Sequence, residues 1–346
     1  MNPIAERPLL TIAIPTYNRA PFLKELLEVL APQLRTVPEI ELLISNNCSP
    51  DETEDVVNTF RDQIPRLNYV RNSENIGSDN NFIQCFHLAT GKFFFLLGDD
   101  DILLPGAIHK IKSLLQHQDP DILYLSTTPF TTDFQSHVRP DPLNRGYRVF
   151  SDAQQFAKLV NIMFTFISCI VVNKDRLSAI GAPPIELARG SALIQLSWVL
   201  PLLRHHRTSI CIFERILAGR VNNGGYFNIA TVLGINLHRE SIRLLSAKSP
   251  IAQCLVSATF RRWFPGELMN LRRSANREEL AKVRSVLETQ YCGNRDYIWF
   301  VAPFFWLPLP IAETWLKSIR VMNKLLYVVN IPNFWSSQKV VSTSDI

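Results

Sequence analysis

Short apolar runs alternate with segments of helical periodicity through the first hundred residues, and this alternation restricts the fold more than any other feature of the chain. Four runs have the length of a strand and lie at residues 9–14, 39–44, 67–70 and 93–97. Between the first two runs, leucines recur at helical spacing over residues 20–34, and Pro21 stands where the first helical turn tolerates proline. Apolar runs separated by amphipathic helices are typical of buried parallel strands, so the sequence predicts an open α/β sheet.

A cluster of polar residues follows each predicted strand. The clusters are Tyr17-Asn18-Arg19, Ser45-Asn46-Asn47, residues 71–75, and Gly98-Asp99-Asp100-Asp101. Ligands of open α/β sheets bind beyond the carboxyl ends of the parallel strands. We therefore expect the four clusters to lie together at one site.

The three consecutive aspartates at residues 99–101 are the strongest chemical signal. Their mutual repulsion raises their pKa values unless a cation neutralises them. A divalent ion held by one or two carboxylates, with phosphate oxygens and water as further ligands, removes that repulsion. The same ion would stabilise a departing nucleoside diphosphate. The alternative is a solvated turn in which Asp101 caps the helix that begins near Pro105.

Two loops carry weaker signals. The segment Asn75-Ile76-Gly77 precedes a predicted helix whose N-terminus can face an anion, and Gly77 permits a positive φ. A structural turn is the better explanation of this loop taken alone. Asp51 stands in the acidic start of the second predicted helix, where it is a candidate site residue or simply a helix cap.

In order and spacing, residues 14–19, 44–51, 75–77 and 98–101 resemble the motifs of family 2 glycosyltransferases. The chain is similar to the branch that contains bacterial abequosyltransferases of O-antigen and surface-polysaccharide assembly. The resemblance covers roughly residues 8–225. It implies a GT-A, Rossmann-like domain that transfers a sugar from a nucleotide-sugar donor to an acceptor hydroxyl.

The resemblance also implies roles for individual residues. The residues expected to bind the donor are Pro15, Thr16, Tyr17, Arg19, Asn46, Asp51, Asn75, Gly77, Asp99 and Arg220. Arg19 would lie near the phosphates, and Asn46 stands where many relatives carry an aspartate that reads the base. Asp100 is expected to be the main ligand of a divalent cation, Mn²⁺ or Mg²⁺, with Asp99 and Asp101 beside it. Arg220 would clamp the diphosphate or the acceptor, although a plain polar loop explains it equally well.

Two departures from the family pattern concern the chemistry. Gly98 stands where many members carry the first acid of the D-x-D motif. Typical inverting members also place an acidic pair at the start of a helix to deprotonate the acceptor, and the matching stretch at residues 189–195 contains no acid. The candidate catalytic residues are therefore Asp100, Glu186, which is the nearest carboxylate, and Gln195, near which relatives of the branch carry a histidine. Glu186 can equally be a surface charge.

Charge is unevenly distributed along the chain. Residues 1–238 contain 21 Lys and Arg against 23 Asp and Glu, whereas residues 239–346 contain 15 against 8, a net charge of +7. The later part reads as helical, basic and amphipathic, so we expect a glycosyltransferase domain at residues 1–235 and a mostly helical C-terminal extension at residues 236–346. Six aromatic residues of the C-terminal extension suit either a membrane interface or packing on the first domain. They are Trp263, Phe264, Trp299, Phe304, Phe305 and Trp306.

The resemblance implies a polyprenyl-diphosphate-linked glycan as acceptor, at the inner face of the cytoplasmic membrane. Six scattered cysteines without a C-x-x-C pair indicate neither a zinc cluster nor a disulfide scaffold, and no apolar signal segment begins the sequence. We therefore expect a cytoplasmic protein that associates peripherally with that membrane. The uncharged stretch at residues 297–311 is too short and too broken by prolines to predict a spanning helix.

Three other functions compete with this prediction. A nucleotidyltransferase also joins an α/β sheet to acidic metal ligands, but it usually carries a glycine-rich phosphate loop that residues 15–19 do not provide. A non-catalytic protein that binds a nucleotide sugar is favoured by the missing acidic pair. A nucleic-acid partner is not expected, because no recognisable binding motif accompanies the basic residues.

Overall fold

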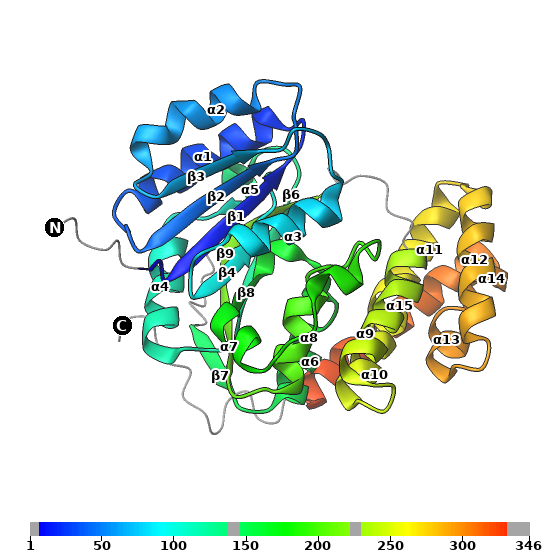
Figure 1. Cartoon of the computed structure of the whole chain (residues 1–346). Coiled ribbons are helices and arrows are strands. Elements are labelled where there is room, and N and C mark those ends of the chain that lie inside the picture. Colours follow the sequence, from blue (N-terminus) through cyan, green and yellow to red (C-terminus); the bar gives the residue numbers. More distant parts are fainter. Residues whose placement is uncertain (1–6, 138–145, 222–229, 331–346) are drawn as a thin grey trace. The chain divides into compact units, whose positions relative to one another are not determined.

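The structure is a computed structural model that describes residues 7–137, 146–221 and 230–330 (Figure 1). The described residues form two compact units. The first contains residues 7–156 and 163–221, and the second contains residues 157–162 and 230–330. The predicted domain boundary at residue 235 stays a prediction, because residues 222–229 lie outside the described ranges.

A nine-stranded sheet forms the centre of the first unit, in the order β3-β2-β1-β4-β8-β6-β9-β5, with β7 paired to β9. The strands are β1 (Leu10–Thr16), β2 (Ile40–Asn46), β3 (Leu67–Arg71), β4 (Phe93–Leu96), β5 (Ile102–Leu103), β6 (Ile122–Phe130), β7 (Tyr147–Phe150), β8 (Ile170–Asn173) and β9 (Ser209–Arg220). The four predicted strands are β1 to β4, and they pair in parallel. Beyond β4 the sheet becomes mixed, because β8 runs antiparallel to both β4 and β6.

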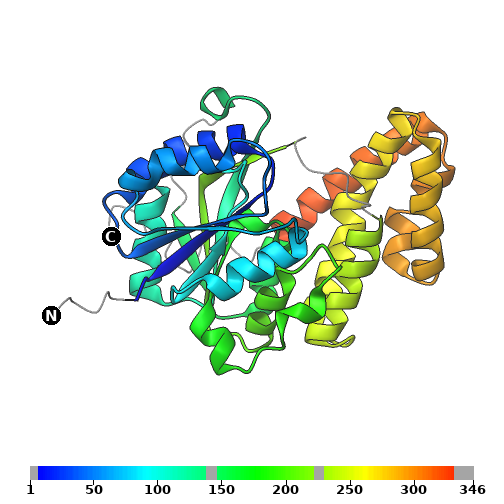
Figure 2. The ribbon, with the colours of Figure 1, turned by 45° about the horizontal axis from the view of Figure 1, so that its top comes forward.

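Helices cover both faces of the parallel half. The α-helices that begin in the first unit are α1 (Ala20–Leu34), α2 (Thr53–Phe60), α3 (Ser78–Leu88), α4 (Ala107–Gln118), α5 (Phe134–His137), α6 (Ala153–Val160), α7 (Lys174–Ala179) and α8 (Leu196–Arg204). Helices α1 and α2 pack together above the sheet, and α3 lies against β1 and β2 on the other side (Figure 2). Short 3₁₀ helices occupy Arg61–Gln63, Asn161–Thr165, Ile167–Cys169 and Ile185–Ala188.

Burial on both faces explains the unbroken apolar runs of the sequence. Every residue of β1, β2 and β4 is buried. On the side of β4 that faces α3, the ring of Phe94 meets the edges of Phe86 and Trp198, which stack on each other at 5.4 Å. This aromatic contact joins α3, β4 and α8. It fixes the direction in which α3 leaves the carboxyl end of the sheet.

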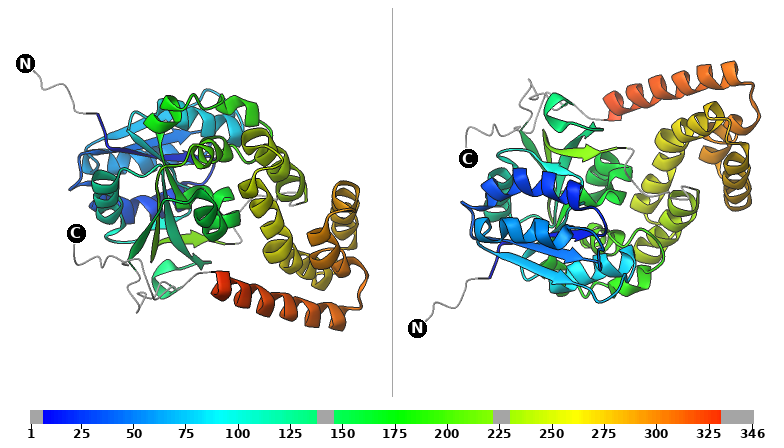
Figure 3. Two further views of the ribbon diagram at one scale, coloured as in Figure 1. Left: turned by 90° about the horizontal axis from the view of Figure 1, so that it is seen from below. Right: turned by 90° about the horizontal axis from the view of Figure 1, so that it is seen from above.

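The second unit is helical. Its helices are α9 (Leu237–Leu245), α10 (Pro250–Ala258), α11 (Phe264–Arg273), α12 (Arg277–Tyr291), α13 (Arg295–Phe300), α14 (Pro303–Trp306) and α15 (Leu309–Asn330), with π-helical stretches at Ala230–Asn236 and Thr259–Trp263. The long helix α15 contacts α11 within this unit (Figure 3). Across the ranges that the structure describes, no helix combines the length and the apolarity needed to cross a membrane.

The core of the second unit corrects part of the interface prediction. Phe264 and Phe304 are fully buried in that core, together with Phe260 and Leu287. They stabilise the unit and are not available to an interface. In contrast, Trp299 and Trp306 are 61% and 62% exposed. Trp263 is half-buried and packs against the core.

Candidate functional site

The parallel strands bring the polar clusters of the sequence to one edge of the sheet, here called the carboxyl edge. Thr16 at the end of β1 pairs with Asn46 at the end of β2, and Asn46 pairs in turn with Arg71 at the end of β3. Strand β4 lies on the other side of β1 and leads directly into the three aspartates. The four clusters therefore lie along adjacent strand ends.

Arg19 connects the first cluster to the aspartates. It stands at the N-cap of α1, and its Nε atom lies 2.9 Å from Oδ1 of Asp99. Its Nη2 atom lies 2.5 Å from Oδ2 of Asp100. The Arg19 and Asp100 side chains are 27% and 17% exposed, so this ion pair is within reach of solvent. Two strand ends are thus joined through one guanidinium group.

Asp99 is buried, and burial raises its pKa to about 7. The positive charge of Arg19 acts in the opposite direction and favours the charged form. Because burial disfavours the charged form of Asp99, a neighbouring positive charge is needed to stabilise that form. In the structure this charge is the guanidinium group of Arg19.

Asp101 is buried, and both of its carboxylate oxygens have hydrogen-bond partners. Its Oδ2 atom accepts a hydrogen bond from the hydroxyl of Ser168, and its Oδ1 atom accepts one from the backbone N–H of Arg220 at 2.9 Å. Burial raises the pKa of Asp101 to about 7. In the structure the Asp101 oxygens hold β9 and the segment that contains Ser168, and the expected role of Asp101 as a supporting metal ligand stays a prediction.

The same packing explains why glycine stands at position 98. The Ser168 hydroxyl also accepts a hydrogen bond from the backbone N–H of Gly98 at 2.9 Å. A Cβ atom at Gly98 would lie 3.0 Å from Oδ2 of Asp101 and 3.2 Å from Oγ of Ser168. An acidic side chain in this place would require both groups to move.

Arg220 is held by contacts inside the unit, and its expected role as a phosphate clamp stays a prediction. Its side chain is only 5% exposed and forms an ion pair with Glu25. Its Nη1 atom donates to the carbonyl oxygen of Thr131 at 2.9 Å, and its guanidinium group lies 4.4 Å from the ring centroid of Phe130. These partners make Arg220 a structural link between β9, β6 and α1.

Asn46 is fully buried at the end of β2. Its Nδ2 atom donates to the hydroxyl of Tyr69 at 2.8 Å, and its Oδ1 atom accepts from the backbone N–H of Ser49. The structure thus places the amide between β2, β3 and the following loop. Arg71, beside it, forms an ion pair with Glu54.

A network of amide side chains holds the loop at residues 75–77. Its central member, Asn47, was placed in a polar cluster from the sequence but was assigned no role. The Nδ2 atom of Asn47 donates to Oδ1 of Asn75 at 2.8 Å, and its Oδ1 atom accepts from the backbone N–H of Ile76. Oδ1 of Asn75 also accepts from the N–H of Gly77, whose φ of +81° is one that L side chains rarely adopt. The position of Asn47 directly after a predicted strand was the available signal.

Asp51 joins the starts of two helices. Its Oδ2 atom accepts from the backbone N–H of Ala20 at 2.8 Å, and its Oδ1 atom accepts from the hydroxyl of Thr53 at 2.5 Å. Burial acts to raise the pKa of Asp51, but these hydrogen bonds outweigh it and the pKa is lowered. These are the contacts of a capping residue, as in the alternative left open by the sequence.

Tyr17 presents an exposed ring immediately after β1. Pro15 and Thr16 precede it as buried residues at the end of that strand. Asn18 adopts a φ of +54°, and its backbone N–H donates to the hydroxyl of Ser49 at 2.9 Å. The turn therefore places an aromatic ring and Arg19 next to each other at the carboxyl edge.

The two further catalytic candidates lie in different surroundings. Gln195 is buried, and its Nε2 atom donates to the carbonyl oxygen of Thr165 at 2.5 Å. Its Oε1 atom has no hydrogen-bond partner among the residues that the structure describes. Glu186 pairs instead with Nε2 of His87 at 2.7 Å, in the last turn of α3. Because α3 begins at the carboxyl edge, the structure does not bring Glu186 to the aspartates.

Asp79 is a further residue that the sequence reasoning missed. Its Oδ2 atom accepts hydrogen bonds from the backbone N–H groups of Gly190 and Ala192, at 2.7 and 3.4 Å. Both partners have positive φ angles, +79° and +56°. Asp79 therefore anchors the stretch that corresponds to the acidic pair of typical family members to the first turn of α3. Its place in that turn was visible in the sequence, but the partner loop was not.

The residues at the carboxyl edge fit a cation that completes its coordination with substrate oxygens. No group of three or more His, Cys, Asp or Glu side chains gathers as a metal centre within the described ranges. Asp100 is the partly exposed carboxylate, and it already attracts the positive charge of Arg19. One or two carboxylates with phosphate oxygens and water form the usual set for Mg²⁺. Asp100, supported by Asp99, meets this requirement.

The sequence of this chain is similar to those of known glycosyltransferases. Residues 11–181 match the family model described as glycosyl transferase family 2, which confirms the resemblance drawn from the motifs. The abequosyltransferase RfbV of Salmonella typhimurium is 30% identical over 184 residues, which cover 50% of this chain and 55% of RfbV. The chain thus spans about half of that relative's length, and it spans 37% and 41% of two further curated relatives.

Two solved structures show the same fold. TarS from S. aureus, residues 1–349 in complex with UDP-GlcNAc, matches with a TM-score of 0.59 and 14% identity, over 93% of this chain and 92% of that one. The mannosyltransferase PcManGT from Pyrobaculum calidifontis, in complex with GDP-Man and Mn²⁺, matches with a TM-score of 0.52 and 14% identity, over 92% and 87% of the two chains. The predicted GT-A-like α/β fold with a helical C-terminal region is confirmed.

Proposed function

Because the chain belongs to glycosyl transferase family 2, we propose that it transfers a sugar from a nucleotide-sugar donor to an acceptor hydroxyl. The observation that carries the proposal is the cluster of Arg19, Asp99 and Asp100 at the carboxyl edge of the sheet. Guanidinium and carboxylate groups at this edge suit a diphosphate and its cation. Support also comes from the solved neighbours, whose complexes contain UDP-GlcNAc in one case and GDP-Man with Mn²⁺ in the other.

The donor would lie along the carboxyl edge. Tyr17 offers an exposed ring on which a base or sugar can stack, with Pro15 and Thr16 forming the wall beneath it. Asn46 and Asp51 would shape this wall from inside, since their side chains hold the adjoining loops. The loop from Asn75 to Gly77 would line the far end of the donor, beside the first turn of α3.

Arg19 would exchange partners when the donor binds. In the structure its guanidinium group contacts Asp99 and Asp100, and a diphosphate would offer it oxygens of greater negative charge. Asp100, with Asp99 beside it, would then hold a divalent cation, Mn²⁺ or Mg²⁺. When bound, such an ion neutralises the charge that develops on the leaving diphosphate.

The transfer step exchanges one bond for another at the anomeric carbon. The acceptor oxygen bonds to that carbon while the bond from the carbon to the diphosphate oxygen breaks, the nucleoside diphosphate leaves with the electron pair, and the hydroxyl proton passes to a water molecule. Gln195 cannot serve as the base, because an amide cannot take the proton and its Oε1 atom is buried. Glu186 would take part only if the pair with His87 opened.

For the acceptor we propose a polyprenyl-diphosphate-linked glycan of bacterial surface-polysaccharide assembly, used at the cytoplasmic face of the membrane. The resemblance to the abequosyltransferase branch supports this class. The similarity to RfbV extends over 184 residues, so it reaches beyond the donor motifs of the first hundred residues. The basic second unit would suit an acceptor that carries a diphosphate.

Product analysis tests the proposed function. The purified protein is incubated with a panel of nucleotide sugars, Mn²⁺ and lipid-linked glycan acceptors, and the released nucleotide and the acceptor mass are measured. We expect release of a nucleoside diphosphate and an acceptor heavier by one sugar. Release of pyrophosphate would indicate a nucleotidyltransferase instead, and donor binding without turnover on any acceptor would indicate a binding protein.

A further inference from the structure

The second unit exposes apolar side chains from one uncharged stretch, residues 297–311, here called the apolar segment. Some of its residues, including Val301 and Phe304, are buried in the core of the unit. Others are exposed to solvent, namely Ile298, Trp299, Trp306, Leu309 and Ile311. Two tryptophans of one short segment are thus more than half exposed, which marks an interaction surface.

Arginines from neighbouring helices contact the apolar segment. The guanidinium group of Arg284, on α12, lies 3.5 Å from the ring centroid of Trp306. That of Arg261 lies 5.1 Å from the ring centroid of Phe300. Arg272, on α11, donates to backbone carbonyl oxygens of the segment at 2.9 and 2.7 Å. The exposed ring of Trp306 and the guanidinium group of Arg284 therefore lie next to each other.

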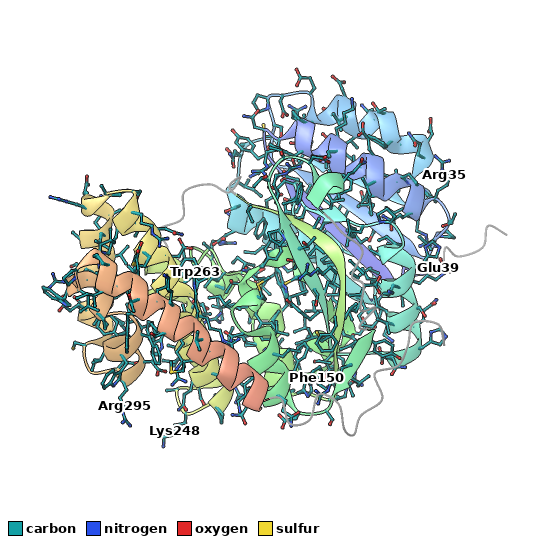
Figure 4. All side chains as sticks on the ribbon, turned by 180° about the vertical axis from the view of Figure 1, so that it is seen from behind. Arg35, Glu39, Phe150, Lys248, Trp263 and Arg295 are labelled. Atoms are coloured by element: carbon teal, nitrogen blue, oxygen red, sulfur yellow. The ribbon has the colours of Figure 1, made fainter. Side chains whose placement is uncertain are left out.

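The surroundings of the apolar segment carry positive charge. Acidic side chains near it are paired with arginines, as in Asp296 with Arg261 at 2.7 Å, and Glu313 with Arg273 at 3.0 Å. Arg295, at the start of α13, projects outward beside the segment (Figure 4). Over residues 230–330 the chain has 14 Lys and Arg against 7 Asp and Glu, a net charge of +7. Arg284 is likewise paired with Glu288 at 3.1 Å, so the excess positive charge belongs to the unit as a whole, and it favours a partner that is both apolar and anionic.

We infer that the apolar segment docks onto the surface of an anionic phospholipid bilayer. Tryptophan prefers the boundary between headgroups and acyl chains, where Trp299 and Trp306 would lie. Arginine can rest its aliphatic stem on apolar surface while its charged end contacts lipid phosphates. Each basic group near an anionic bilayer adds to the attraction. The positive charge and the exposed aromatic rings thus favour an anionic bilayer as the partner of the apolar segment.

Vesicle flotation without any nucleotide tests this inference independently of sugar transfer. Phosphatidylcholine vesicles with and without phosphatidylglycerol are mixed with the wild type and with a Trp299→Ser/Trp306→Ser variant. We expect the wild type to bind the anionic vesicles and the variant to bind at least about tenfold more weakly. High salt should weaken wild-type binding. Leu187→Ser, which changes an equally exposed apolar residue of the first unit, should bind like the wild type.

Two results would overturn the inference: equal binding by the wild type and the double variant, or failure of the wild type to bind anionic vesicles. Light scattering tests a second explanation of the exposed surface, namely that two copies of the chain contact each other through it. If the wild type is a dimer and the double variant a monomer, the apolar segment is a contact between copies, and the lipid assignment is wrong. Quenching of wild-type tryptophan fluorescence by brominated lipid requires no substitution, so it tests the same contact even if the variant is unstable.

Discussion

Arg19 and Arg220 lie over the same phenylalanine ring, with their guanidinium carbons 5.0 and 5.1 Å from the centroid of Phe22. The two arginines nevertheless have different surroundings. Arg19 is partly exposed and contacts Asp99 and Asp100 at the carboxyl edge. Arg220 is buried and contacts Glu25 and backbone carbonyl groups. We propose that Arg19 meets a ligand and that Arg220 holds the fold.

Alanine substitutions should separate these two roles. We expect Arg220→Ala to lower the free energy of unfolding by about 3–5 kcal/mol, because Glu25 loses its partner and a cavity forms. Arg19→Ala should cost about 1–2 kcal/mol but weaken the binding of a nucleoside diphosphate at least about tenfold. Urea unfolding and isothermal titration provide the two measurements. A larger stability loss for Arg19→Ala than for Arg220→Ala would contradict this assignment.

Gly98→Ala should destabilise the protein by about 1–3 kcal/mol, since the new methyl group would press against Asp101 and Ser168. Gly266→Ala is a matched control, because a Cβ atom at this helical position meets nothing within 4 Å. The control should be neutral or slightly stabilising. Thermal unfolding compares the two variants. If both variants melt at the wild-type temperature, the carboxyl edge is looser than the structure indicates.

Ser168→Ala should lower the free energy of unfolding by about 1–3 kcal/mol. The substitution removes the donor to Oδ2 of Asp101, which would remain buried, and the acceptor for the partly buried backbone N–H of Gly98. Ser178→Ala removes an exposed hydroxyl and serves as the control. Urea unfolding of both variants gives the comparison. Equal stability of the two would show that the Ser168 hydroxyl does not hold Asp101.

Asp79→Ala should release the loop that contains Gly190 and Ala192. Loss of these hydrogen bonds, worth about 1–2 kcal/mol, should speed amide hydrogen exchange of Gly190 and Ala192 by about 5- to 30-fold. Asp55→Ala, an exposed change on α2, should leave this exchange unaltered. Mass spectrometry of peptides from residues 186–196 measures the rates. Unchanged exchange in Asp79→Ala would mean that other contacts hold the loop.

The parallel half of the fold could be predicted from the sequence because its strands are buried on both faces. Unbroken apolar runs such as Phe93 to Leu97 are then the only compatible pattern, and the polar residues after them necessarily fall at one edge. The antiparallel strand β8 was not foreseen. A buried apolar run has the same pattern in a parallel and in an antiparallel strand. The sequence of β8 therefore does not specify the direction in which it pairs with β4.

The direction of individual side chains could not be predicted from spacing. Asp99, Asp100 and Asp101 are consecutive, yet only the first two reach Arg19, because a serine 67 residues later in the chain binds the third. Arg220 illustrates the same limit. Its residue type suits a phosphate, but its partners on α1 and β6 are set by tertiary packing that no local pattern reveals.

The affinity for nucleoside diphosphates with and without Mn²⁺ tests the central claim most directly. Isothermal titration of UDP, GDP, CDP and dTDP into the wild type and Asp100→Asn would give the dissociation constants, and thermal unfolding would check that both are folded. We predict that Mn²⁺ tightens binding of at least one diphosphate to the wild type by about tenfold or more, which is about 1.4 kcal/mol, and that Asp100→Asn loses this gain. The same gain in Asp100→Asn, or none in the wild type, would contradict the account.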